Sequence, residues 1–180
     1  MVLGNDFPSA KLLLEIAKKE YDKEDGRKSS LETRLNILVT FNSAILCFIL
    51  SYHDFSKIIR LVFFKDCLPP AICFIAALEL IIFSCLVSSL IFSLACFFYA
   101  LSTKQYLRFN LDNLLSETKK AESVFSISVV QYYNYLLNHN REQTSVKLNW
   151  FVRGSFLLFL AVLLLILFYI IDTILKTFMG

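Results

Sequence analysis

The sequence predicts an all-α membrane protein with three transmembrane helices and with helical cytoplasmic segments at the N-terminus and in the centre of the chain. Three observations support this fold class. First, 57% of the 180 residues are hydrophobic and 18% are charged, whereas a soluble domain carries roughly 45–50% apolar and about 25% charged residues. Second, three long stretches contain no formal charge. Third, lysine and arginine are concentrated in segments that these stretches would place on one side of a membrane.

This composition excludes several classes of protein. A soluble enzyme with one compact core would be less apolar, and a disordered chain would be far more polar. The five cysteines are too few and odd in number for a secreted disulfide framework. The net charge of +3 is too small to predict a nucleic-acid partner, so we expect no direct nucleic-acid binding.

Each uncharged stretch is long enough to cross a bilayer as a helix, which takes about 20 residues. The predicted transmembrane helices cover residues 35–53, 80–103 and 154–171. The second has an apolar extension upstream, and the middle of residues 70–101 offers no Gly, Pro or Asn for a turn. We therefore predict one long helix over 70–101 that begins at Pro69-Pro70. The shorter run 58–64 contains Arg60 and is predicted to lie in a connecting loop at the interface.

The orientation follows from the lysines and arginines between the spans. Residues 1–34 and 104–153 hold seven each, whereas residues 54–79 hold three and residues 172–180 hold one. Fourteen basic residues on one side and four on the other predict a cytoplasmic N-terminus and a cytoplasmic central segment. Residues 54–79 then form an external loop, and residues 172–180 form an external tail. No signal peptide is expected, because the first thirty residues are polar and mixed in charge.

The N-terminal cytoplasmic segment is predicted to form two helices. Residues 9–23 are amphipathic, and Ser9 is a suitable N-cap. Gly26 is expected to end this helix. Ser29-Ser30-Leu31-Glu32 has the spacing of a capping box and is expected to start a second helix that continues through Arg34 into the first span.

The central segment, residues 104–153, is predicted to form a helical hairpin below the membrane. Its first helix would cover Tyr106–Glu122, and a second apolar segment covers Val124–Leu137. Val124–Tyr135 is also compatible with a strand on propensity alone. Asn138-His139-Asn140 is the clearest turn signal before the chain returns to the membrane.

Residues suited to catalysis, metal binding or phosphate binding are sparse. The two histidines, His53 and His139, belong to no metal-ligand motif, and the four glycines are isolated. Four cysteines lie in apolar segments, where they act as small hydrophobic residues, and Cys67 in the outer loop is a candidate for an intermolecular disulfide or a free thiol. We expect no enzymatic activity and no cofactor.

Polar residues lie along one face of each of the first two spans. They recur every three or four residues, which places them on one side of a helix. In the first span they are Asn36, Thr40, Ser43, Cys47 and Ser51, and in the second they are Cys85, Ser89, Ser93 and Cys96. These faces either pack helices together through small residues or line a path for water and ions in an oligomer, with the apolar third helix against lipid.

Glu79 is the acid next to the second span. At the outer interface it would be solvated, which the predicted topology favours. An acid in hydrocarbon is costly. If the helix lies deeper, the Glu79 side chains of the copies in an oligomer would therefore form a ring of carboxylates at a pore mouth.

A charged N-terminal helix that ends in Glu32-Thr33-Arg34-Leu35 is followed by a polar-streaked first span that begins Asn36-Ile37-Leu38, a short outer loop, a second span and a long cytoplasmic helical segment. This layout covers nearly the whole chain and resembles the SLATT family of bacterial membrane effectors. The third span departs from the two-span version of that family.

The resemblance implies a multi-pass protein of the bacterial inner membrane that acts in anti-phage defence. Such an effector forms a pore or disrupts the membrane as a homo-oligomer, which arrests or kills the infected cell. The implied partners are a retron reverse transcriptase or a nucleotide-signalling sensor. Two alternatives are a harmless membrane anchor for a larger complex and a holin-like phage lysis protein.

Overall fold

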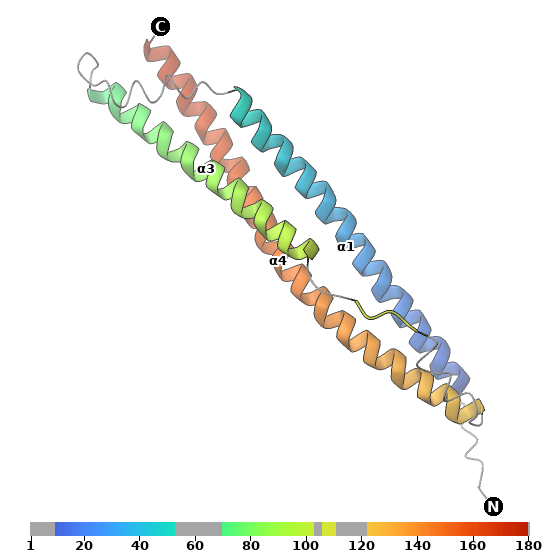
Figure 1. Ribbon diagram of the computed structural model, residues 1–180. Coiled ribbons are helices and arrows are strands. Elements are labelled where there is room, and N and C mark those ends of the chain that lie inside the picture. Colours follow the sequence, from blue (N-terminus) through green and yellow to red (C-terminus); the bar gives the residue numbers. More distant parts are fainter. Residues whose placement is uncertain (1–9, 53–69, 103–105, 111–121, 180) are drawn as a thin grey trace, which may run out of the picture. The chain divides into compact units, whose positions relative to one another are not determined.

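The structure, a computed structural model, describes residues 10–52, 70–102, 106–110 and 122–179. Within these ranges the chain forms three α-helices and no strand, namely α1 (Ala10–Tyr52), α3 (Pro70–Ser102) and α4 (Glu122–Met179) (Figure 1). Each helix is long and apolar enough to cross a membrane, judged by length and composition. The predicted all-helical protein with three apolar helices is thereby confirmed in its coarse form.

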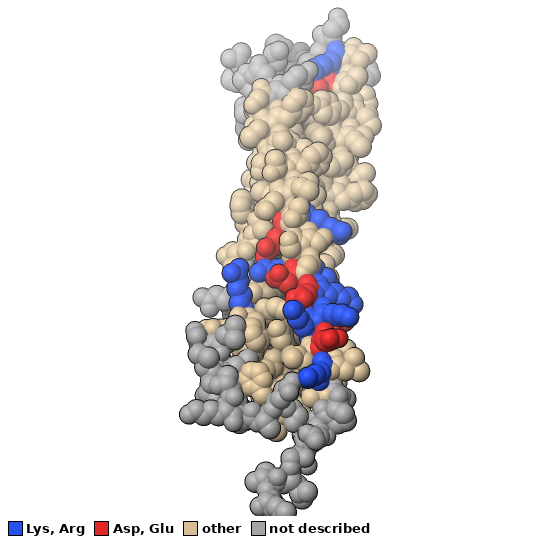
Figure 2. Space-filling model, turned by 90° about the vertical axis from the view of Figure 1, so that its right-hand side faces the viewer, with Lys and Arg blue, Asp and Glu red and all other residues tan. Residues whose placement is uncertain are grey.

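The chain divides into two compact units. Unit 1 comprises residues 1–34 and 102–148, and unit 2 comprises residues 35–101 and 149–180. The helices α1 and α4 contribute residues to both units. The charged residues of the described chain are concentrated in unit 1, because only four described residues of unit 2 carry a formal charge, namely Glu79, Arg153, Asp172 and Lys176. On the face that Figure 2 shows, most of the charged side chains lie together in one band, and a few more lie near one end.

Unit 2 is a bundle of three apolar helical segments. The segment of α3 runs in the direction opposite to those of α1 and α4 (Figure 1). Its core contains large side chains that are fully buried, namely Leu35, Leu86, Leu90 and Phe97. Small residues are also fully buried, among them Ala76, Ala100 and Ala161, and they let the helix backbones approach closely.

Unit 1 pairs the first part of α1 with the first part of α4. The two run in the same direction, since Glu20 pairs with Arg141 and Glu32 with Lys147. The non-helical segment Tyr106–Asn110 lies against both helices and makes hydrogen bonds to each. Phe109 stacks on Tyr133 with 4.8 Å between the ring centroids.

Two predictions about α1 are wrong. Gly26 does not end a helix, and Ser29–Glu32 does not begin one, because α1 runs without interruption from Ala10 to Tyr52. A single helical glycine costs about 1 kcal/mol, which the packing of unit 1 on both sides of Gly26 offsets. Ser9 lies outside the described residues.

Two parts of the prediction for 104–153 are wrong, and residues 111–121, which make up most of the first helix of the predicted hairpin, lie outside the described residues. The turn at 138–140 is absent, because α4 continues through it, and Tyr106–Asn110 is not helical. The helical interpretation of Val124–Tyr135 is confirmed, and the strand alternative is excluded.

The predicted long second helix is confirmed, since α3 runs unbroken from Pro70 to Ser102. At 1.5 Å per residue its 33 residues are about 50 Å long. The predicted interfacial run 58–64 and Cys67 lie outside the described residues.

Candidate functional site

The polar face predicted on the first span lies on the outside of unit 2. Its members are exposed, apart from the half-buried Ser43; the exposed ones are Asn36, Thr40, Cys47 and Ser51. Thr40 donates a hydrogen bond within its own helix, from Oγ1 to the main-chain oxygen of Asn36 at 3.0 Å. Because these four residues are exposed within the described part of the chain, the face is available to a neighbouring helix or to water.

The polar face predicted on the second span is mostly used for packing within the chain. Ser89 donates from Oγ to the main-chain oxygen of Leu157 at 2.8 Å, and Ser93 donates to that of Gly154 at 2.8 Å. Cys96 is half-buried beside the same contact, whereas Cys85 is exposed. The structure therefore separates two faces that the sequence pattern treats alike.

The close approach of α3 and α4 depends on Gly154. A Cβ atom at this position would lie 2.6 Å from Cε1 and 2.7 Å from Cδ1 of Phe97, and 3.2 Å from Cβ of Cys96. The ring of Phe97 is fully buried and cannot move aside without displacing its neighbours. A glycine at this position is thus a steric requirement of the packing.

Sequence reasoning missed Asn42, which is the most deeply buried polar residue of α1. It is fully buried and donates from Nδ2 to the main-chain oxygen of Leu90 at 3.3 Å. The sequence carried a signal for it: Asn42 lies seven residues after Leu35 and seven before Ile49, and all three are buried. A polar residue within a seven-residue apolar repeat is typical of a buried interhelical hydrogen bond.

Glu79 is not solvated within the chain, contrary to the favoured interpretation. Its side chain is fully buried in unit 2. Asp172 and Lys176 of α4 lie within electrostatic range of it and form an ion pair at 2.6 Å. Glu79 therefore belongs to a charged cluster between α3 and α4 in the single chain.

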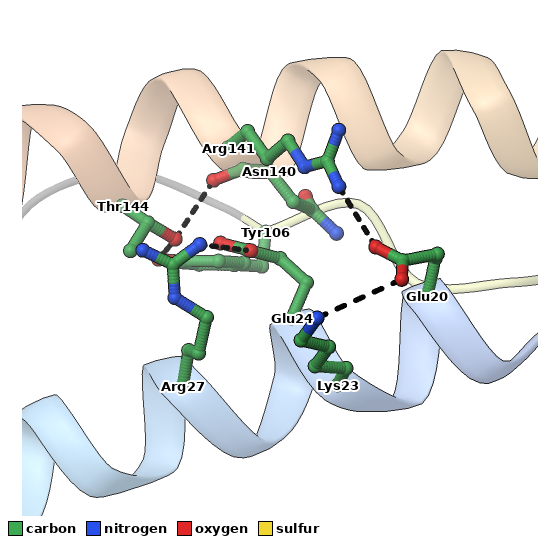
Figure 3. A network of polar contacts seen from close by, with 8 residues as sticks. All are labelled: Glu20, Lys23, Glu24, Arg27, Tyr106, Asn140, Arg141 and Thr144. Carbon is green, nitrogen blue, oxygen red and sulfur yellow. Dashed lines mark hydrogen bonds and ion pairs between the residues drawn. The ribbon is translucent and has the colours of Figure 1, made fainter.

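In unit 1, Tyr106 is the centre of a polar network that joins the segment 106–110 to both helices (Figure 3). Its hydroxyl lies 2.8 Å from Oγ1 of Thr144, which donates in turn to the main-chain oxygen of Asn140 at 2.9 Å. The ammonium of Lys28 lies 4.0 Å from the centre of the Tyr106 ring, and that of Lys147 lies 5.1 Å from it. Two cations over one ring give a cation–π attachment of the segment to α1 and to α4.

Asn140 holds the main chain of the same segment. Its Oδ1 accepts from the amide of Leu107 at 3.1 Å, and its Nδ2 donates to the oxygen of Leu107 at 3.1 Å. Tyr21 of α1 also donates to that oxygen, at 3.5 Å. The side chain that suggested a turn thus satisfies both backbone groups of a non-helical residue, as a neighbouring strand would.

Ion pairs complete the network. Lys147 is buried and donates to Oε1 of Glu32 at 2.8 Å. Glu24 is buried and pairs with the exposed Arg27 at 3.2 Å. Arg141 pairs with Glu20 at 3.0 Å across the two helices. A buried cation needs such a partner, because removal from water is costly.

The surroundings shift the pKa of two tyrosines in unit 1 upward. Burial raises the pKa of Tyr106 most strongly, and Glu32 acts in the same direction, whereas the hydrogen bond to Thr144 lowers it. Burial also raises the pKa of Tyr133, with a further contribution from Asp22. Both phenols therefore remain protonated, and able to donate, to higher pH than a free tyrosine.

Among the described residues, His, Cys, Asp and Glu form no group of three or more that could hold a metal ion. Comparison of the chain with protein-family models, with curated proteins and with solved structures finds no match. The resemblance to the SLATT family therefore rests on the sequence layout alone and stays a prediction.

Proposed function

We propose that this chain is a membrane effector of a bacterial anti-phage system that permeabilises the inner membrane as a homo-oligomer. The observation that carries the proposal is the exposed polar face of α1, formed by Asn36, Thr40, Cys47 and Ser51. In hydrocarbon such a face is satisfied by a second copy of the helix or by water. Several copies that turn these faces toward a common axis would enclose a polar path.

The packing within unit 2 supports the assignment of α1 to this path. Ser89 and Ser93 of α3 are occupied by hydrogen bonds to α4, so they hold the bundle together and are not free to line a pore. One flank of the α1 face carries exposed large apolar side chains, among them Ile37, Phe41 and Phe48. These side chains suit lipid or a neighbouring copy beside the path.

Unit 1 is the part that would receive the signal. Its charged surface and the network around Tyr106 offer a partner many polar contacts, and α1 and α4 contribute residues to both units. A sensor, such as a reverse transcriptase or a nucleotide-signalling protein, would favour one packing of unit 1 over another and so shift the population of open oligomers. In this proposal unit 1 is cytoplasmic, as the distribution of basic residues predicts.

The test compares two double variants on the exposed surface of α1. Thr40→Leu with Cys47→Leu makes the polar face apolar, whereas Ala44→Leu with Phe48→Leu places the same side chain at two exposed positions beside it. Induced bacteria are assayed for membrane potential and for uptake of a membrane-impermeant dye, and membrane fractions are probed for equal amounts of protein. We expect depolarisation by the wild type and the control, and at least a tenfold higher inducer requirement for the first variant.

Equal toxicity of both double variants would contradict the pore assignment to α1. Absence of depolarisation by the wild-type chain, at verified membrane levels, would favour the anchor alternative instead. Ser89→Leu is unsuited to this purpose, because it removes a hydrogen bond to Leu157 and inserts a larger side chain into the contact with α4.

A further inference from the structure

Unit 1 contains an open groove of about 460 Å³ between α1 and α4. On α1 its lining residues lie at helical spacing along one face, and on α4 it is bounded by Thr144 and Leu148. The α1 residues that line it are Lys23, Gly26, Arg27, Ser30, Leu31 and Arg34. Figure 3 shows Lys23 and Arg27 on α1 and Thr144 on α4.

The charge of the groove has one sign. Three of its eight lining residues are cationic, and none is acidic. Lys23 pairs with the partly exposed Glu20 at 3.7 Å, whereas Arg27 pairs with the buried Glu24 at 3.2 Å. Arg34 is exposed and has no ion-pair partner among the described residues. The exposed pair of Lys23 with Glu20 is weak, so Lys23 and Arg34 give the groove a positive potential that attracts anions.

The groove is also open and equipped with donors. A Cβ atom at Gly26 would have nothing within 4 Å, so the glycine leaves free space beside the cations. Ser30, which carries a hydroxyl, is exposed. Guanidinium and ammonium groups together with a hydroxyl are the donors that bind phosphate oxygens.

We propose that this groove binds a phosphate group carried on a larger anion, and that an anionic phospholipid headgroup is its source. The cations from Lys23 to Arg34 extend over about 16 Å of helix, which exceeds what one inorganic phosphate can span. Leu31 and the exposed Leu148 add an apolar wall. In sequence, Arg34 and Leu148 directly precede the segments of α1 and α4 that belong to unit 2. In the proposed topology these segments span the membrane, so the two residues lie at the level of the lipid headgroups.

The test uses the full chain purified in a neutral detergent, so it does not depend on the proposed pore activity. Binding of short-chain phosphatidylglycerol is measured by thermophoresis, with short-chain phosphatidylcholine and inorganic pyrophosphate as separate arms. Lys23→Gln with Arg34→Gln should weaken binding at least about tenfold, because charge-assisted hydrogen bonds to the phosphate oxygens are lost. Both side chains are exposed, and the pair between Glu24 and Arg27 is left intact.

The matched control is Lys18→Gln with Lys19→Gln, which removes the same charge from exposed positions of α1 outside the groove. Its affinity should stay within about twofold of the wild type, as expected for a screened surface effect. Gly26→Phe fills the groove without changing its charge and should also abolish binding. Circular dichroism and thermal unfolding of every variant confirm that the fold is retained.

Saturable binding of phosphatidylglycerol, lost in both groove variants and kept in the control, supports the proposal. The same pattern with pyrophosphate in place of the lipid supports the phosphate site and overturns the lipid source. Equal weakening by the groove and control variants, or no saturable binding to either anion, overturns the site. Depolarisation of cells by a chain that binds neither anion would leave the proposed function standing and refute only this inference.

Discussion

Ser93 of α3 donates a hydrogen bond from Oγ to the main-chain oxygen of Gly154 in α4 over 2.8 Å. The serine is fully buried, and the glycine carries no side chain to hold the two backbones apart. Because lipid is as apolar as a leucine side chain, helices within a bilayer associate through such close contacts and interhelical hydrogen bonds. Substitutions at this contact therefore test how α3 and α4 stabilise unit 2.

Ser93→Ala should lower the free energy of unfolding by about 0.5–1.5 kcal/mol, because it removes one interhelical hydrogen bond and almost no volume. Ser84→Ala is the matched control, since Ser84 is exposed and donates only within its own helix, to Leu80 at 2.9 Å. Unfolding of the full chain in mixed micelles measures both. An equal effect of the two substitutions would show that the bond to Gly154 contributes nothing beyond helix propensity.

The two helical glycines should respond oppositely to alanine. Gly154→Ala places a Cβ atom 2.6 Å from the buried ring of Phe97 and should destabilise the chain by about 1–3 kcal/mol through overpacking. Gly26→Ala meets nothing within 4 Å and should stabilise it by about 0.5–1 kcal/mol through helix propensity. The same micelle titration measures each variant, and stabilisation by Gly154→Ala would contradict the packing described for unit 2.

Asn140→Ala should detach the segment 106–110 from α4. Both hydrogen bonds to Leu107 are lost. The Leu107 amide is then left without this partner, whereas the Leu107 oxygen keeps the hydrogen bond from Tyr21, and we expect a cost of about 1–3 kcal/mol. Asn138→Ala, two residues away on the exposed side of α4, should change the unfolding free energy by less than about 0.5 kcal/mol. Hydrogen exchange at the Leu107 amide provides the local measurement. Unchanged protection of that amide in Asn140→Ala would refute the pairing.

Glu32→Gln should destabilise unit 1 more than Lys147→Met does. The first substitution leaves the buried ammonium of Lys147 without its carboxylate, and the second removes the charge while keeping an unbranched side chain of similar length. Since Glu32 is partly exposed, we expect about 1–2 kcal/mol for Glu32→Gln and less than about 1 kcal/mol for Lys147→Met. Thermal unfolding of the full chain orders the two variants, and the reverse order would be inconsistent with a buried cation held by its partner.

Unit 1 should lose stability in alkali. The pKa of Tyr106 is raised in the folded chain, so its contribution is fully present below the pKa of an unfolded tyrosine, about 10. That contribution is lost as the pH rises through the folded value. Tyr106→Phe should reduce the decline in unfolding temperature above pH 10, whereas Tyr135→Phe, at an exposed position, should leave it unchanged. An identical alkaline decline in all three proteins would exclude Tyr106 as its source.

The sequence alone determined the number and approximate position of the apolar helices. Long runs without charge leave few structures other than spanning helices, because every backbone group in hydrocarbon needs an internal partner. For the same reason, the absence of a turn residue between Pro70 and Ser102 was enough to predict the unbroken α3. Local signals were less dependable in unit 1, where Gly26 and Asn140 both lie inside continuous helices.

Only the tertiary structure decided what each polar residue does. The spacing of Thr40 and Ser93 is equivalent in sequence, yet one is exposed on α1 and the other donates to Gly154. Helical periodicity places residues on a face but does not say what that face meets. Asn140 was predicted to lie in a turn, but its side chain binds the backbone of Leu107. The side-chain amide of an asparagine can form hydrogen bonds with a distant backbone as well as with the backbone next to it. Such distant partners follow from packing and not from local pattern.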